Sequence, residues 1–403
     1  MKIIERPEIL SQVLGHIGKG LIIVLVGQRR VGKSYVLKML RNKIASTPDN
    51  ANIIYIDKEK REFDSLKTYT DLNSYIEAHL APNRHNYILI DEAQDIQEFE
   101  RSVRSYRTEP NTDVVITGSN SHILSSELST LLGGRYREIY VQPLSYREFL
   151  TFHGLADTDD SLALYLDYGG LPGLARIGLN EDDAREYQWD VYHTALLKDV
   201  IMRHNIRNSV FLENLVRFLA DNEGKLISAS SISKYMRGQG ARITPTAILN
   251  YISYIAEAFI IDKADRYDIH GKRLLESNSK YYFEDNGIRN AIAGGSREGD
   301  IEKVLENVVY QHLVRLGYRV YVGQLQAGEI DFVCEKSGGK RAYVQVSYII
   351  IDDSTRKREF GPLASIADNY PKYVISMTPL VSRSDYNGII HLHLRRFLMQ
   401  GLD

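Results

Sequence analysis

The residues best suited to chemistry lie in a glycine-rich segment near the amino terminus. Residues 27–34 read GQRRVGKS and match the spacing G-x-x-x-x-G-K-S. Glycine lets successive backbone N–H groups point at phosphate oxygens, and a helix that begins here adds the positive end of its dipole. Lys33 would reach the β- and γ-phosphates of a nucleotide, and the Ser34 hydroxyl would ligate Mg²⁺. We therefore expect a nucleotide phosphate site formed by Gly27, Gln28, Arg29, Arg30, Val31, Gly32, Lys33, Ser34 and Tyr35.

Two adjacent acids supply the second half of this chemistry. They end an apolar run in YILIDEAQD at residues 87–95. Asp91 would orient Mg²⁺ through its water shell, and Glu92 would polarise the water that attacks the γ-phosphate. The alternative for the glycine-rich segment is a turn before an ordinary buried helix. The alternative for the two acids is a solvated strand end. Together the two patterns favour an ATP site with Mg²⁺.

Two further groups are candidates for sensing the γ-phosphate. The apolar run DVVITGSNS at 113–121 ends in small polar residues, and Ser119 is favoured slightly over Asn120. Either residue is equally suited to cap a following helix. Arg135, with Arg137 as second choice, lies in an expected loop between a helix and a strand. It would approach a phosphate of its own subunit or, in an oligomer, of a neighbour; the alternative is a surface arginine with an acidic partner.

The elements that must position these residues alternate between strand and helix. Apolar runs at 21–26, 52–57 and 87–92 are separated by stretches with helical periodicity, such as 67–80. This alternation predicts an α/β fold with a parallel sheet that is covered on both faces. We expect this P-loop sheet core to form a first domain over residues 1–154.

The middle of the chain, residues 155–285, has a different pattern. It is helical to about residue 205, with a break at GGLP (169–172), and three further helices are expected at 211–222, 228–237 and 244–258. Two strands around the turn IHGKR follow. Three helices and a β-hairpin predict a winged helix.

The charges of this segment give limited support to DNA binding. Arg237, Arg242, Lys272 and Arg273 are placed to meet phosphates, but the third helix contains no lysine or arginine. A winged helix that packs against protein or serves as a lid of the ATPase is therefore preferred. Non-specific DNA contact comes second, and reading of a DNA sequence is the least supported alternative.

The carboxy-terminal residues 286–403 predict a small α/β domain. Glu306 lies on an expected helix, Asp331 on an expected strand, and Gln345 and Ser347 share one face of the next strand. This is the layout of PD-(D/E)XK nucleases, but glutamine stands where that pattern has glutamate, and serine where it has lysine. An amide is a poorer Mg²⁺ ligand than a carboxylate. We expect a restriction-endonuclease-like fold whose nuclease site is degenerate.

The composition of the chain limits the classes of protein to which it can belong. The formal net charge of the 403 residues is −2, so no global basic field indicates nucleic acid. The one cysteine, Cys334, rules out an intramolecular disulfide and fits a reducing compartment. The amino terminus has no signal-peptide pattern, and no apolar stretch approaches a membrane span. We expect a cytoplasmic protein with no membrane partner.

Several strings together resemble one family. They are GQRRVGKS, LIDEAQD, ITGSNSHIL, GGRYREIYVQPLSYREF and GGLP. They are similar to a prokaryotic group of AAA-like ATPases, which have an additional-strand P-loop core, a winged-helix segment and a carboxy-terminal restriction-endonuclease-like domain. The resemblance covers nearly the whole chain. It implies an ATPase in which the strand at 113–121 lies between the P-loop strand and the strand that ends in Asp91.

These observations favour an Mg²⁺-dependent ATPase whose nucleotide state is coupled to the winged-helix and nuclease-like parts, acting on or near DNA. A nucleotide-switched regulatory protein with protein partners and no DNA is the alternative. An ATP-dependent Mg²⁺ nuclease is the third hypothesis. A homo-oligomer or a protein partner is compatible with each of them.

Overall fold

The strand Ile22–Val26 (β1) is buried along its whole length and lies inside a parallel sheet. The computed structural model describes residues 4–47, 51–118, 132, 134–238, 240, 243–294, 298–326, 328–379 and 381–402. Within these residues the sheet has five strands in the order β2-β3-β4-β1-β5. Its other strands are β2 (Ala51–Asp57), β3 (His85–Asp91), β4 (Thr112–Thr117) and β5 (Tyr136–Tyr140). The order confirms the parallel α/β core and the expected place of β4 between β1 and β3.

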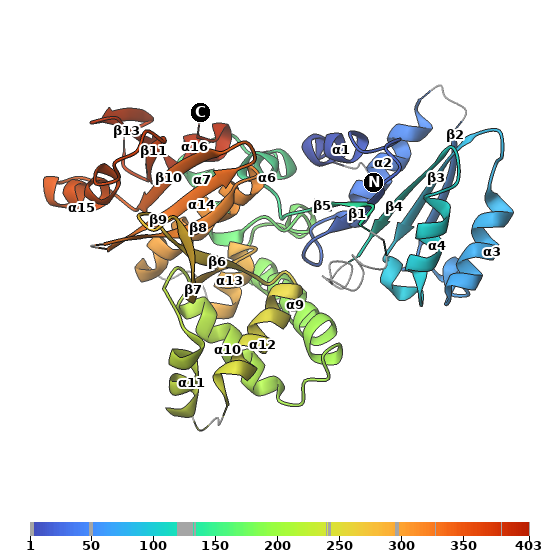
Figure 1. Cartoon of the computed structure of the whole chain (residues 1–403), viewed down its shortest axis with the longest axis horizontal. Helices are drawn as coiled ribbons and strands as arrows, with labels where there is room; N and C mark the ends of the chain where they lie inside the picture. Colours follow the sequence, from blue (N-terminus) through green and yellow to red (C-terminus); the bar gives the residue numbers. More distant parts are fainter. Residues whose placement is uncertain are drawn as a thin grey trace. The chain divides into compact units, whose positions relative to one another are not determined.

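Helices cover both faces of this sheet (Figure 1). Alternate residues of β1 point to opposite sides, because successive side chains of a strand alternate. Ile23 and Leu25 pack with α1 and α2, whereas Ile22 and Val24 pack with α3 and α4. The helices and the two short 3₁₀ turns are α1 (Pro7–Leu14), α2 (Lys33–Ala45), η1 (Arg61–Phe63), α3 (Tyr69–His79), η2 (Ala93–Asp95) and α4 (Phe99–Tyr106).

The chain divides into two compact units. Unit 1 comprises Met1–Gln142 with Glu257–Phe259, and unit 2 comprises Pro143–Ala256 with Ile260–Asp403. Unit 1 holds the five-stranded sheet.

Unit 2 begins with a series of helices. Ser145 caps the first of them: its hydroxyl accepts from the Glu148 N–H and the Glu148 carboxylate accepts from the Ser145 N–H, which forms a capping box. Helix α9 continues directly into a π-helical segment, η4. Helices α10, α11 and α12 lie together at one end of the unit (Figure 1). These elements are α6 (Tyr146–His153), α7 (Asp159–Tyr168), α8 (Leu174–Ile177), α9 (Glu181–Ala195), η4 (Leu196–Met202), α10 (Ser209–Asp221), α11 (Ala229–Gly238) and α12 (Pro245–Glu257).

The second sheet runs through the rest of unit 2. Among the described residues it has eight strands in the order β12-β13-β11-β10-β9-β8-β6-β7. Its strands are β6 (Ile261–Asp268), β7 (Arg273–Phe283), β8 (Arg319–Leu325), β9 (Gly328–Lys336), β10 (Lys340–Ser347), β11 (Lys372–Ser376), β12 (Arg383–Tyr386) and β13 (Ile389–His393). The helical elements around it are α13 (Asn286–Ala293), η5 (Glu298–Asp300), α14 (Ile301–Arg315), α15 (Asp353–Ala364) and α16 (Leu394–Gln400).

The hairpin β6–β7 has a partner that the sequence did not indicate. Strand β6 pairs in parallel with β8, so the expected wing is continuous with the sheet of the carboxy-terminal residues. The domain boundary expected at residue 285 therefore falls inside one compact unit. Three helices and a hairpin are present as expected, but their identity as a winged helix stays a prediction.

The break GGLP, residues 169–172, lies where two segments of unit 2 come into close contact. The Gly170 N–H donates to Asp285 Oδ2 at 2.7 Å. Gly169 has a φ of +68°, and a Cβ there would lie 2.5 Å from Asp285 Oδ1. The two glycines thus let the end of α7 approach the carboxylate that caps α13.

Candidate functional site

The glycine-rich loop joins β1 to α2 at the carboxyl edge of the first sheet. Gly27 has a φ of +142°, and a Cβ there would lie 2.2 Å from the Val141 carbonyl oxygen. Lys33 is 5% exposed, and its Nζ donates to the carbonyl oxygens of Gly27 and Gln28, both at 2.8 Å. The lysine therefore lies across the loop, where phosphate oxygens would offer its ammonium alternative acceptors.

Arg6 braces this loop from outside. Its guanidinium is 3% exposed and donates to the Val31 carbonyl oxygen and to the Gln142 carbonyl oxygen, both at 3.0 Å. Because the planar fork reaches two carbonyls at once, it fixes the loop relative to the residues that follow β5. The sequence offered no sign of these two contacts.

The strand that ends in Asp91 meets the start of α2. The Ser34 side chain lies close enough to the Asp91 carboxylate to lower its pKa. The Thr117 hydroxyl, at the end of β4, donates to Asp91 Oδ1 at 2.6 Å and accepts from the Glu92 N–H at 2.9 Å. The structure thus brings together Ser34 and Asp91, which the sequence predicted as Mg²⁺ ligands, and adds Thr117.

Burial and two neighbouring acids make the Asp91 carboxylate costly to ionise. Burial raises the pKa of Asp91 to about 6, against the lowering effect of hydrogen bonds from Thr117 and Ser34. The nearby acids Glu92 and Asp57 raise the pKa further. A buried carboxylate among hydroxyls and other carboxylates is a fitting place for a divalent cation.

Glu92 is held in an uncommon backbone conformation. Its φ of 56° and ψ of 53° lie in the left-handed region, which non-glycine residues rarely adopt. The Gln94 amide donates to its carboxylate. Such backbone strain is concentrated at functional sites, so the observation fits the predicted role of Glu92.

Thr117 gives a direct test of how Asp91 is oriented. We expect Thr117→Val to lower kcat of ATP hydrolysis by about 10–100-fold, because groups that orient a metal ligand have effects of this size. The substitution also leaves the Glu92 N–H without its acceptor. Thr117→Ser keeps the hydroxyl and is expected to retain most of the activity; equal losses in both variants would argue against the orienting role. Steady-state phosphate release measures both variants.

The remaining predicted residues of unit 1 have different outcomes. Arg30 (φ 66°) is exposed in the loop, and Tyr35 is 40% exposed on α2. Ser119 and Asn120 lie outside the described residues. Arg135 precedes β5, and its carbonyl oxygen accepts from the Ile22 N–H at 3.1 Å.

This position sets Arg135 apart from the loop. It lies beside the first residue of β1, whereas the loop follows the last, five residues or about 16 Å away along the strand. The structure therefore does not bring Arg135 to the nucleotide edge of its own sheet. A role toward a neighbouring subunit stays a prediction.

In unit 2 the predicted degenerate site is only partly assembled. Glu306 on α14 and Asp331 on β9 lie on either side of Lys280 of β7. Gln345 Oε1 accepts from the Asp331 N–H at 3.3 Å, and Gln345 Nε2 donates to Glu359 Oε2 at 3.2 Å. Ser347 is buried at the end of β10. Among the described residues, no group of three or more His, Cys, Asp or Glu side chains is arranged to hold a metal ion.

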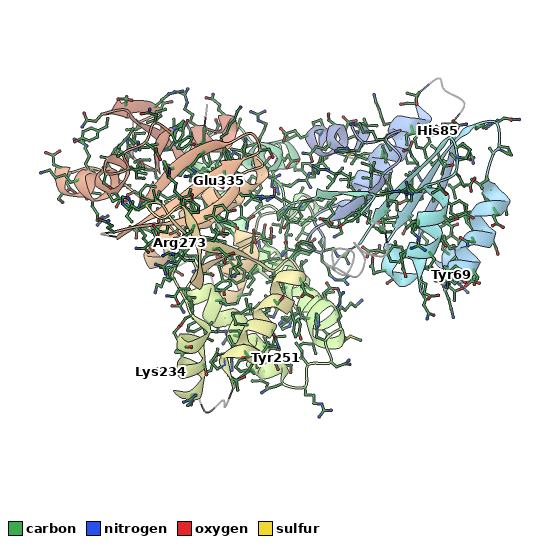
Figure 2. All side chains as sticks on the ribbon, in the orientation of Figure 1. Tyr69, His85, Lys234, Tyr251, Arg273 and Glu335 are labelled. Atoms are coloured by element: carbon green, nitrogen blue, oxygen red, sulfur yellow. The ribbon has the colours of Figure 1, made fainter. Side chains whose placement is uncertain are left out.

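The basic side chains proposed to meet DNA are spread over the surface of unit 2. Arg273 begins β7 and is 73% exposed, and its Nε lies 3.8 Å from Asp268 Oδ2. Arg237 and Lys272 are exposed, and Arg242 lies outside the described residues. Figure 2 shows Arg273 and, on α11, the exposed Lys234. These residues do not form one continuous basic segment of the sequence. DNA binding by them stays a prediction.

Two functional residues escaped the sequence reasoning. Thr117 ends strand β4 within the run DVVITGSNS, two residues before Ser119. Lys280 is a single charged residue beside aromatic residues in SKYYF. In both cases the available signal was a polar side chain next to an apolar or aromatic run of its strand.

Membrane insertion through a helix finds no support in the described residues. No helix among them is both long enough and apolar enough to cross a bilayer.

Comparison with known proteins identifies the first unit and leaves the second open. Residues 19–150 match the family model described as AAA domain, and residues 159–299 match a domain of unknown function, DUF8612. These matches confirm the AAA-like part of the resemblance. The winged-helix and endonuclease-like parts stay predictions.

Relatives along the whole chain are known. An uncharacterized protein of Haemophilus influenzae is 33% identical over 403 residues, covering 98% of this chain and 99% of the relative. An uncharacterized protein of Methanocaldococcus jannaschii is 26% identical over 356 residues, covering 84% and 77%.

Two solved structures show weaker likeness. The Walker-type ATPase of Pyrococcus abyssi has 16% identity and a TM-score of 0.48, covering 72% of this chain and 95% of that one. Cdc6p from Pyrobaculum aerophilum has 15% identity and a TM-score of 0.33, covering 77% and 95%.

Proposed function

Because the chain belongs to the same family as the Haemophilus influenzae protein and carries an AAA domain, we propose that it binds ATP with Mg²⁺ and hydrolyses it. The observation that carries this proposal is the meeting of Ser34 with the buried Asp91 carboxylate, which also accepts a hydrogen bond from Thr117 at 2.6 Å. This contact joins the start of α2, directly after the glycine-rich loop, to Asp91 at the end of β3. Both lie at one edge of a parallel sheet.

The side chains at this edge fit a magnesium nucleotide. Ser34 and Asp91 would hold Mg²⁺, which, when bound, supplies positive charge that neutralises phosphate oxygens. Lys33 would exchange its two carbonyl acceptors for phosphate oxygens. Gly27 lets the loop lie against the Val141 carbonyl oxygen, where a Cβ would clash.

Glu92 would act on the attacking water. Its carboxylate can accept a proton or polarise the water O–H, provided that it points past Asp91 toward the phosphate. Thr117 contributes by holding the Glu92 N–H and the Asp91 carboxylate in one hydrogen-bonded chain. The Gln94 amide donates to the Glu92 carboxylate and would compete with the attacking water for it.

Steady-state ATP hydrolysis by wild type and Lys33→Ala tests the proposal. We expect the lysine variant to lose about 10²–10³-fold in rate, because it loses a positive charge at the transferring phosphoryl group. Lys43→Ala is the matched control, since Lys43 is exposed at the end of the same helix. Equal rates in wild type and Lys33→Ala would show that the activity comes from elsewhere.

The same assay with double- and single-stranded DNA separates the proposed kinds of ATPase. A several-fold, Lys33-dependent stimulation would support coupling to DNA. A Lys33-dependent rate that ignores DNA would favour the nucleotide-switched regulatory protein. Any stimulation should fall with salt, because phosphate contacts release counterions.

A further inference from the structure

A buried lysine lies at the centre of the acidic cluster in unit 2. Lys280 of β7 has a side chain that is only 2% exposed. Its Nζ lies 2.9 Å from Glu306 Oε1, 3.3 Å from Glu329 Oε1 and 3.7 Å from Asp331 Oδ1. One ammonium is thus the shared partner of three carboxylates that come from α14 and β9.

The carboxylates are also bound from other sides. The Tyr282 hydroxyl donates to Glu306 Oε1 at 2.6 Å, and the Val346 N–H donates to Asp331 Oδ2 at 2.8 Å. A Cβ at Gly224 would lie 3.0 Å from Glu306 Oε2, so the backbone packs against that oxygen. Glu329, 40% exposed, forms the solvent side of the cluster. Glu306 Oε1 and both oxygens of Asp331 are therefore engaged with other groups of the protein.

The charge balance is compatible with a cluster that needs no metal. Burial lowers the pKa of Lys280, but the three carboxylates outweigh it and raise the pKa above its ordinary value, so the lysine stays protonated. Burial and the neighbouring Glu306 raise the pKa of Asp331, whereas Lys280 lowers it. Carboxylate oxygens such as these are typical ligands of divalent cations in other proteins.

We propose that the Lys280 ammonium is the permanent cation of this cluster, occupying the position in which Glu306, Glu329 and Asp331 would otherwise hold a divalent ion. Unit 2 then has no metal-dependent cleavage chemistry of its own. Removing the lysine should uncover a cation site of oxygen-ligand type. This inference is independent of ATP hydrolysis, and its test uses no nucleotide.

Mn²⁺ binding by Lys280→Met tests the proposal, with electron paramagnetic resonance or calorimetry as the readout. All proteins carry Asp91→Asn, so that the candidate ATP site contributes little to metal binding. We expect no binding with Lys280 intact, and in Lys280→Met one site with a Kd of about 10⁻⁴ to 10⁻³ M, as for weak carboxylate sites. Adding Asp331→Asn should abolish that site.

The matched control is Lys263→Met on the neighbouring strand β6. Lys263 is half-exposed and pairs with Asp265 at 2.7 Å, so its loss removes the same charge but uncovers no buried cluster. This variant should bind no Mn²⁺. Should Lys280→Met fail to fold, adding Mn²⁺ during refolding is expected to restore a cooperative thermal transition.

Three results would overturn the proposal. The first is Mn²⁺ binding with Lys280 intact that is lost on Asp331→Asn. The second is a Lys280→Met protein that folds without binding Mn²⁺, or that Mn²⁺ fails to restore. The third is cleavage of supercoiled plasmid with Mg²⁺ or Mn²⁺ that disappears in Asp331→Ala.

Discussion

Glu92→Gln is expected to lower kcat for ATP hydrolysis by about 10²–10³-fold while nucleotide binding is retained, since a positioned general base contributes on this scale. The amide has nearly the shape of the carboxylate but can neither accept a proton nor polarise water as an anion. Asp91, Ser34 and Lys33, the expected ligands of the magnesium nucleotide, are unchanged. Single-turnover hydrolysis and equilibrium binding of a fluorescent ATP analogue separate the two effects.

Glu98→Gln is a matched control for this substitution. Glu98 has the same left-handed φ of 56°, but it is exposed at the start of α4 and pairs with Arg101 at 3.1 Å. The control shows whether losing a glutamate in this backbone conformation is itself harmful. Unchanged turnover in Glu92→Gln would remove Glu92 from the catalytic role.

Much of unit 1 could be predicted because its signals are local. The spacing in GQRRVGKS specifies a loop between a strand and a helix, and an apolar run that ends in Asp91 and Glu92 specifies a strand at the same sheet edge. Parallel strands place their carboxyl ends together. The meeting of Ser34 and Asp91 follows from these rules.

Contacts between distant segments could not be predicted in the same way. Thr117 reaches Asp91 because β3 and β4 are neighbours with a particular register, and no local signal distinguishes Thr117 from the polar residues that follow it. Arg135 shows the reverse, since its place in an expected loop between a helix and a strand suggested a phosphate contact. The pairing of β5 with β1 places it at the other edge of the sheet.

The hairpin β6–β7 illustrates a further limit. Alternating residues around a turn predict two antiparallel strands, and this pairing is present. The same sequence pattern is compatible with a free wing and with a hairpin that joins a larger sheet. Only the partner strand β8, more than fifty residues further along the chain, decides between them. The contact of Lys280 with Glu306 depends on the same long-range arrangement.

The second large effect concerns Asp91. Its ionised carboxylate is expected to bind a cation, but burying that charge lowers the stability of the folded protein. The folded-state pKa of about 6 lies above the ordinary value of 3.8, so folding favours the protonated form and penalises the ionised one. The penalty is full above about pH 6 and disappears as the pH falls below 3.8. We therefore expect Asp91→Asn to raise the free energy of unfolding of the nucleotide-free protein by about 2–3 kcal/mol at pH 8 and by little near pH 4.

The same substitution should remove most of the stabilisation that Mg²⁺ and ATP give, because asparagine is a poorer cation ligand. Chemical unfolding at several pH values, with and without Mg²⁺ and ATP, measures both effects. Asp113→Asn is the control, since Asp113 is equally buried but lies near the opposite end of β4 and pairs with His85 at 2.7 Å. It should not stabilise the protein. A nucleotide-free Asp91→Asn protein that is less stable than wild type at pH 8 would mean that the Asp91 carboxylate is a net stabilising group, and the trade between stability and cation binding would be lost.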